Sequence, residues 1–202
     1  MTFWNPGRGC LADDTTHNHF SEHSQSLALI CGLGSHSQKK AMLRALTSQE
    51  LYRTTIYYSF YLFEVLLKNG YYDLFAKRME HWHNHLSLGC RTTLETPEPS
   101  RSDCHAWGSH PIYHFYSSLL GIRPASFGFK TVSITPCMGS LTEISGSMPH
   151  PKGKITVSLR RMGHSIEVAV ELPKDVAGVY FWGASVRKLH SGKQRFHISH
   201  QL

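Results

Sequence analysis

The stretch ITVSLRRMGHSIEVAVE, residues 155–171, decides the fold of the second half of the chain. Apolar side chains occupy every second position on both sides of the turn at Arg161–His164, as in Ile155, Val157 and Leu159. A period of two places successive side chains on opposite faces of a strand. The stretch therefore predicts an antiparallel β-hairpin with one buried face.

Four shorter segments around this hairpin carry the same strand-type pattern. They are residues 129–135, 141–148, 179–182 and 186–189. Short strands with one apolar face bury that face by packing as two sheets. We therefore expect an antiparallel β-sandwich over residues 123–202.

The first half of the chain has helical periodicity instead. Five stretches carry it, namely residues 21–32, 35–48, 54–67, 71–86 and 111–121. The first, third and fifth are apolar on most sides, whereas the second and fourth are amphipathic. This alternation indicates helical hairpins in two layers, with inner helices packed against outer ones. The predicted fold class is thus α+β, with helical hairpins in residues 1–122 followed by the β-sandwich.

Composition excludes several classes of protein. The net charge is +7, but the 21 Lys and Arg are scattered and not interleaved with aromatic residues, so we expect no nucleic-acid partner. No apolar run reaches membrane-spanning length. The five cysteines are widely spaced without a Cys-x-x-Cys pair, which argues against a disulfide framework and a zinc ribbon. The first residues lack the pattern of a signal peptide, so we expect a cytoplasmic, reducing location.

A polar loop, RTTLETPEPSRSDCHAW at residues 91–107, lies between two of the predicted helices. It contains the acids Glu95, Glu98 and Asp103, followed by His105 and Trp107. An acid can activate water, a histidine can bond hydroxyl groups, and a flat ring offers an apolar wall. These are the groups that a sugar-cleaving pocket needs.

Several phrases of the sequence, in this order, resemble the C-terminal end of bacterial α-L-rhamnosidases. They are FSEHSQ at 20–25, RTTIYYS at 53–59 with YLFE at 61–64, TTLE and CHAW in the loop, LGIRP at 120–124, PCMGSL at 136–141 and MPHPKG at 148–153. No single phrase is sufficient, but their order makes the resemblance specific over nearly the whole chain.

The resemblance implies a six-hairpin (α/α) barrel that carries the active site, followed by a β-sandwich. Such enzymes hydrolyse terminal α-L-rhamnose from glycosides with inversion, using two carboxyl groups and no metal or organic cofactor. By the motif, Glu95 matches the general base. His105 matches a histidine that hydrogen-bonds the sugar, and Trp107 matches a stacking wall.

The resemblance also implies a departure from the family's pattern. The general acid and most rhamnose-binding acids of the family lie upstream of anything present in this sequence, so the chain begins inside the barrel. We therefore expect a fragment with the general base but without the acid, inactive alone. Its unpartnered apolar helix faces favour association with the missing upstream barrel segment or self-association.

Simpler interpretations stand beside these. Glu95 could be a loop acid paired with Arg91 or Arg101, and Glu98 and Asp103 are its rivals as the base. Glu64, in an apolar helix, is either paired and structural or faces the polar centre of the barrel.

Two groups of histidines suggest a metal site. His81, His83 and His85 alternate in a predicted helix, and His17, His19 and His23 form the second group. Because no third ligand is evident at helical spacing, we expect no bound metal at either group.

Two other functions fit the sequence. One is a non-catalytic carbohydrate-binding or scaffolding module, which would bind rhamnose without cleaving it. The other is a basic interaction protein that binds polyanions, whose binding would weaken steeply with salt.

Overall fold

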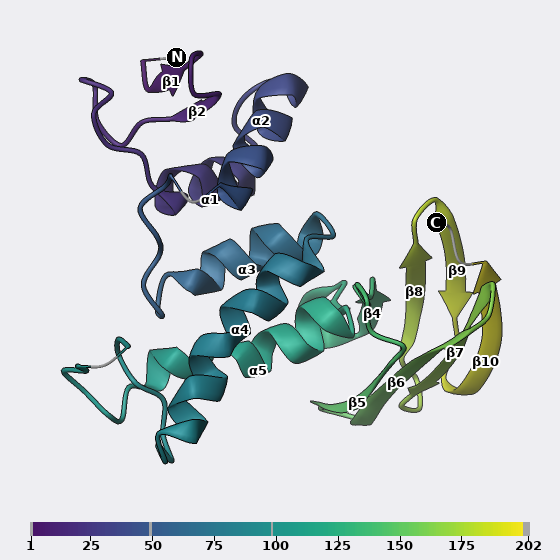
Figure 1. Ribbon diagram of the computed structural model, residues 1–202. Coiled ribbons are helices and arrows are strands. Elements are labelled where there is room, and N and C mark those ends of the chain that lie inside the picture. Colours follow the sequence, from purple (N-terminus) through teal and green to yellow (C-terminus); the bar gives the residue numbers. More distant parts are fainter. Residues whose placement is uncertain (1, 49, 98, 200–202) are drawn as a thin grey trace. The chain divides into compact units, whose positions relative to one another are not determined.

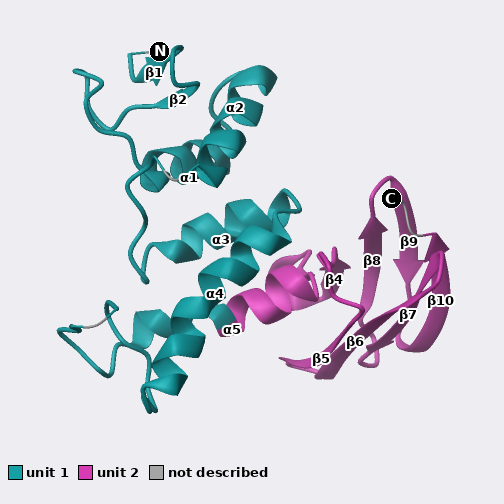
Figure 2. Ribbon diagram, viewed as in Figure 1, with its two compact units in different colours: residues 1–111 teal, residues 112–202 magenta. Residues whose placement is uncertain are grey.

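The computed structural model describes residues 2–48, 50–97 and 99–199. The chain divides into two compact units, Met1–Pro111 and Ile112–Leu202 (Figure 2). The division falls at the first residue of helix α5 (Pro111–His114). The domain boundary predicted from the sequence lies after this helical segment, at residue 122, and stays a prediction.

The first unit is mainly helical (Figure 1). A small hairpin of β1 (Trp4–Asn5) and β2 (Cys10–Leu11) precedes the helices α1 (Glu22–Ile30), α2 (His36–Thr47), α3 (Ser59–Lys68) and α4 (Tyr72–Ser87). Helix α1 packs against α2 and α3, and α3 packs against α4. Within the described ranges, no helix is both long and apolar enough to cross a membrane.

Serine side chains begin the first two helices. The Ser21 hydroxyl accepts a hydrogen bond from Ser24 N at 3.4 Å. At Ser35 the arrangement is reciprocal, because Gln38 N donates to the serine hydroxyl and the Gln38 side chain accepts from Ser35 N at 2.8 Å. Such caps satisfy N–H groups that the first helical turn leaves without partners.

Helix α3 begins later than predicted. The sequence predicted a helix from residue 54, but α3 starts at Ser59. The N–H and hydroxyl of Thr54 both donate to Glu22 Oε2, at 2.7 and 3.0 Å. These bonds to a buried carboxylate hold residue 54 outside the helix.

The second unit contains two four-stranded sheets. One sheet has the order β10-β7-β6-β5 and is antiparallel throughout. Its strands are β5 (Glu143–His150), β6 (Gly153–Met162), β7 (Ser165–Leu172) and β10 (Gly192–Ser199). The predicted hairpin is confirmed as β6 and β7, with Val157 opposite Val170 and Leu159 opposite Val168.

The other sheet has the order β3-β4-β8-β9. Its strands are β3 (Ile122–Pro124), β4 (Thr131–Ile134), β8 (Ala177–Trp182) and β9 (Ser185–Leu189). Strands β4 and β8 are parallel, so the expectation of purely antiparallel pairing is wrong for this pair. The chain crosses through β5, β6 and β7 before it returns as β8, and such a crossover allows parallel pairing. Gly178 lies opposite Val132, where a Cβ would collide with the Val132 side chain and carbonyl.

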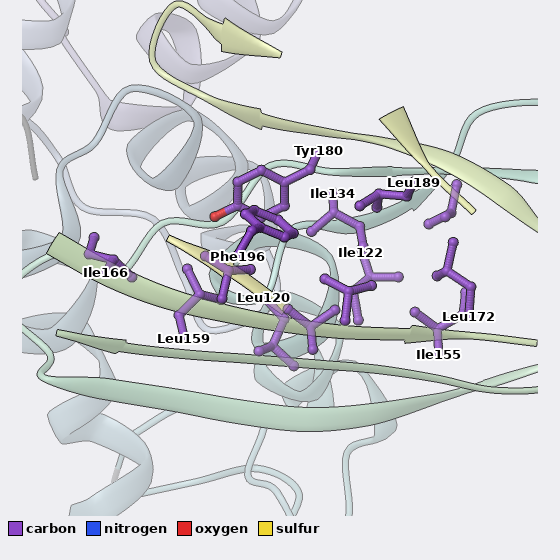
Figure 3. Close-up of a cluster of buried hydrophobic side chains, with 14 of the residues drawn as sticks. Leu120, Ile122, Ile134, Ile155, Leu159, Ile166, Leu172, Tyr180, Leu189 and Phe196 are labelled. Atoms are coloured by element: carbon purple, nitrogen blue, oxygen red, sulfur yellow. The ribbon is translucent and has the colours of Figure 1, made fainter. Parts of the chain in front are cut away.

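Both sheets contribute to one hydrophobic core (Figure 3). Ile122, Ile134 and Tyr180 come from the β3-β4-β8-β9 sheet, and Ile155 and Leu159 from the other sheet. Each fully buried aliphatic side chain contributes about 1.5–3 kcal/mol to folding. The fold is therefore mixed α+β, with a second unit that is stabilised by its own core.

Candidate active site

The loop that carries the predicted site residues folds back on itself as a short ladder of hydrogen bonds. His105 N donates to Thr93 O at 2.7 Å, and Thr93 Oγ1 donates to His105 O at 2.5 Å. Glu95 N donates to Ser102 O at 3.0 Å. The Thr92 hydroxyl donates to the carbonyl of Asp103. The backbones of Glu95 and His105 are thus both held within one ladder.

A hydrogen bond and the close packing of Gly108 attach the ladder to helix α4. Leu94 is fully buried and Gly108 is buried beside it. A Cβ at Gly108 would lie 2.8 Å from Thr93 Cβ and 2.9 Å from Leu94 O, so only glycine allows this packing. The indole N–H of Trp82, on α4, donates to Gly108 O at 2.6 Å. These contacts fix the position of the loop within the helical unit.

The Glu95 carboxylate forms an ion pair with Arg101. The Glu95 side chain is 20% exposed, whereas Arg101 is 80% exposed. An ionised carboxylate only accepts hydrogen bonds and can take a proton from a nearby water. The pairing that the sequence offered as the simpler interpretation is therefore present, and it leaves Glu95 in reach of solvent.

Aromatic rings extend from His105 toward the segment that precedes helix α3. The rings of His105 and Trp107 meet edge to face, with centroids 5.2 Å apart. Trp107 also lies 4.9 Å from Tyr57, at an interplanar angle of 45°. Trp107 is 61% exposed and Tyr57 45% exposed. Large exposed aromatic surfaces beside polar groups are typical of ligand sites.

The rival acid Asp103 takes part in the ladder through its backbone carbonyl. The backbone of Asp103 accepts the Thr92 hydrogen bond, while the residue itself is exposed. Glu98 lies outside the described residues. Glu64 on α3 is half-buried and has an interaction partner, so the choice between its two predicted roles stays open.

His110 was missed by the sequence reasoning. Its Nε2 lies 3.0 Å from Ile56 O and 3.1 Å from Ser59 Oγ, and its ring packs against Phe63 and Trp82. Burial lowers the pKa of His110, which favours the neutral ring. A histidine before a proline gives no sequence signal for this role as a link between the loop and α3.

The histidines of the group His17, His19 and His23 have other partners. His19 Nδ1 lies 2.8 Å from the Asp14 carboxylate, and His23 packs against Tyr58 at 4.2 Å. Hydrogen bonds from Thr16 and His19 hold the pKa of Asp14 well below its usual range. Across residues 2–48, 50–97 and 99–199, no three His, Cys, Asp or Glu side chains are placed to hold a metal ion.

The mixed α+β architecture has the fold of rhamnosidases of family GH78. The enzyme from Bacillus sp. GL1 superposes with a TM-score of 0.79 and 23% identity over 90% of this chain and 21% of its own. The α-L-rhamnosidase of Aspergillus terreus gives 0.78 and 17% identity, over 96% of this chain and 25% of its own.

The sequence matches are narrower. Residues 121–193 match the family described as Bacterial alpha-L-rhamnosidase C-terminal domain. An α-L-rhamnosidase of Alteromonas sp. (strain LOR) is 29% identical over 137 residues, which are 59% of this chain. The match spans only 15% of that relative's length. The predicted resemblance to bacterial α-L-rhamnosidases is confirmed.

Proposed function

We propose that the chain supplies the general base and the sugar-binding loop of an inverting α-L-rhamnosidase. The observation that carries this proposal is the hydrogen-bonded ladder, which holds Glu95 and His105 in one loop of a chain similar to rhamnosidases. The substrate would be a glycoside with a terminal α-L-rhamnose.

In the proposed reaction, the Glu95 carboxylate accepts a proton from a water as that water attacks the anomeric carbon. A second carboxyl group protonates the leaving oxygen on the opposite face of the sugar. Inverting enzymes hold the two carboxyl groups about 6.5–9.5 Å apart, which leaves room for the water. His105 would bond a sugar hydroxyl, and Trp107 would cover an apolar face of the ring.

The general acid would come from outside these 202 residues. In the same proposal, helices α1 to α4 are hairpins of an (α/α) six-hairpin barrel, and residues 123–202 are its β-sandwich. Exposed apolar side chains in and after α1 support the proposal that a neighbouring segment is missing. They are Leu27, Ile30 and Leu33, which are 44%, 44% and 52% exposed. The partner would be the upstream barrel segment, or a second copy of the chain.

The alternative is a non-catalytic carbohydrate-binding or scaffolding module. The exposed rings of Trp107 and Tyr57 favour sugar binding as such, with or without cleavage. In that case a Glu95→Gln variant would bind rhamnose as the unchanged chain does.

The deciding experiment is a chimera of the Bacillus sp. GL1 enzyme in which these 202 residues replace the corresponding segment. Hydrolysis of a chromogenic α-L-rhamnoside is measured for the chimera, its Glu95→Gln variant and the chain alone. We expect turnover by the chimera, a loss of about 100-fold or more in kcat with Glu95→Gln, and no turnover by the chain alone.

Arg101→Ala is the matched control, because it removes the partner of Glu95 and keeps the carboxylate. Exposed ion pairs contribute at most about 1 kcal/mol, so this variant should keep most of the activity. An equal effect of both variants would mean that Glu95 serves only as an ion-pair partner, and the assignment of the base would be wrong.

A further inference from the structure

A polar pocket lies in the helical unit, apart from the candidate loop. It has a volume of about 150 Å³ and is lined by residues from the end of α2, from α4 and from the start of α1. Its charged lining residues are Glu22, Arg53, Lys77, Arg78 and Glu80.

The carboxylate of Glu22 has little capacity left for a ligand cation. One of its oxygens is paired with Arg78, and the other accepts two hydrogen bonds from Thr54. The side chains of Glu22 and Arg78 are 4% and 9% exposed, so this pair forms the inner wall of the pocket. In the described part of the chain, Arg78 makes its one hydrogen-bonded pair with Glu22, which leaves further guanidinium donors for another acceptor.

The other two cationic side chains of the lining are Arg53 and Lys77. Within the described residues, neither Arg53 nor Lys77 forms a hydrogen bond or an ion pair with the protein. Glu80 is exposed at the rim. The pKa of His81 is lowered, as expected for a partly buried ring in a positive environment. Burial and the charges of Arg78, His85 and Arg53 lower this pKa more than Glu80 raises it. The pocket is therefore positive, in a chain whose net charge is +7.

We propose that this pocket binds a small tetrahedral oxyanion, a sulfate or phosphate group, through Arg53, Lys77 and Arg78. Guanidinium groups present paired N–H donors that match two oxygens of such an anion, and Lys adds a point charge. Asn84 and Ser48 line the same pocket and offer neutral donors. The site is independent of the proposed hydrolysis, since it uses none of the residues of the candidate loop.

The test is calorimetric titration of the full chain with sodium sulfate, at constant ionic strength kept with chloride. We expect saturable binding, weakened roughly tenfold by Arg53→Gln and by Lys77→Gln, since each loses one charge-assisted contact. Neither residue has a hydrogen-bond or ion-pair partner among the described residues, so neither change should unfold the chain. Lys40→Gln, an exposed change on α2 outside the lining, should alter the affinity less than about twofold.

A pH series provides a second arm. Sulfate stays a dianion between about pH 7.5 and 5.5, so any change of affinity belongs to the protein. Charged or titratable groups that act on His81 are Arg78, His85, Arg53 and Glu80, and Glu22 and Lys77 line the same pocket. Sulfate should bind more tightly as the pH falls, and His81→Gln should reduce this gain. Absence of saturable binding, or equal affinities of Arg53→Gln and Lys40→Gln, would overturn the proposal.

Discussion

The two units are stabilised in different ways. The second unit buries side chains of both sheets in one core, which includes Val157, Leu159 and Val168, each fully buried. The helical unit also buries apolar side chains, among them Leu62, Phe63 and Leu66, but it encloses the Glu22–Arg78 ion pair and leaves Leu86 and Leu88 70% and 63% exposed. The family match at 121–193 lies in the second unit, whereas Glu95, His105 and Trp107 lie in the first. The family model thus matches a different unit from the one that carries the candidate site residues.

The largest effect should come from Gly121→Ala in the second unit. Gly121 has φ of 72°, and a Cβ there would overlap the backbone of Thr135. We expect a loss of more than about 4 kcal/mol, measured by chemical denaturation. Gly163→Ala is the matched control, because φ is 59° and the surrounding space is open, so only about 1–2 kcal/mol should be lost. Equal losses would show that strain, and not the close approach, sets the requirement for glycine.

In the helical unit, Arg78→Met should cost about 3–5 kcal/mol, because it leaves the Glu22 carboxylate buried without its cation. The double variant Glu22→Gln/Arg78→Met should recover most of this loss. Helix unfolding in urea, followed by circular dichroism, gives both values. A double variant that is as unstable as the single one would mean that the packing of the Arg78 side chain, and not its charge, stabilises the helical unit at this position.

Trp82→Phe should cost about 1 kcal/mol, since it removes the hydrogen bond to Gly108 O and keeps most of the packing. In the active chimera, kcat should fall by more than the loss of stability explains. The reason is that the loop that carries Glu95 loses its hydrogen bond to α4. Tyr71→Phe, at the start of α4 and outside the candidate loop, serves as a control for aromatic changes. An unchanged kcat would mean that Trp82 does not position the loop that carries Glu95.

The smallest effect concerns pH. Folded His110 takes up a proton at a lower pH than the unfolded chain, which does so near 6.5. Below that value the unfolded state binds more protons, so the helical unit loses stability as the pH falls. His110→Gln should flatten this dependence, and the part that remains should include His81, whose pKa is also lowered. A slope that His110→Gln leaves unchanged would show that other groups cause it.

Hydrophobic periodicity predicted much of the fold. Helices α1, α2 and α4 begin and end within two residues of the predicted stretches. Strand β10 was missed because its inward positions hold only two apolar side chains, Phe196 and Ile198, after the polar Gln194. The parallel pairing of β4 with β8 depends on contacts distant in sequence, which no local pattern contains.

The candidate site residues were predicted from short sequence motifs more than from hydrophobic periodicity or composition. Glu95 and His105 came from the resemblance, and Glu95 and Glu98 could not be distinguished by composition. Trp82 on α4 holds the loop through one hydrogen bond to Gly108 O, and a tryptophan on an amphipathic helix gives no sign of such a role. These contacts required the three-dimensional arrangement.

The ladder around Glu95 has a consequence for how the site arises. Its hydrogen bonds join residues no more than 12 apart in the chain, as between Thr93 and His105. Closing so short a segment loses little entropy, and contacts of this kind form early in folding. The loop is therefore largely self-contained: the local geometry around Glu95 is encoded almost entirely within it, and we expect that it could be transplanted between related chains together with Gly108 and a tryptophan that donates to Gly108 O.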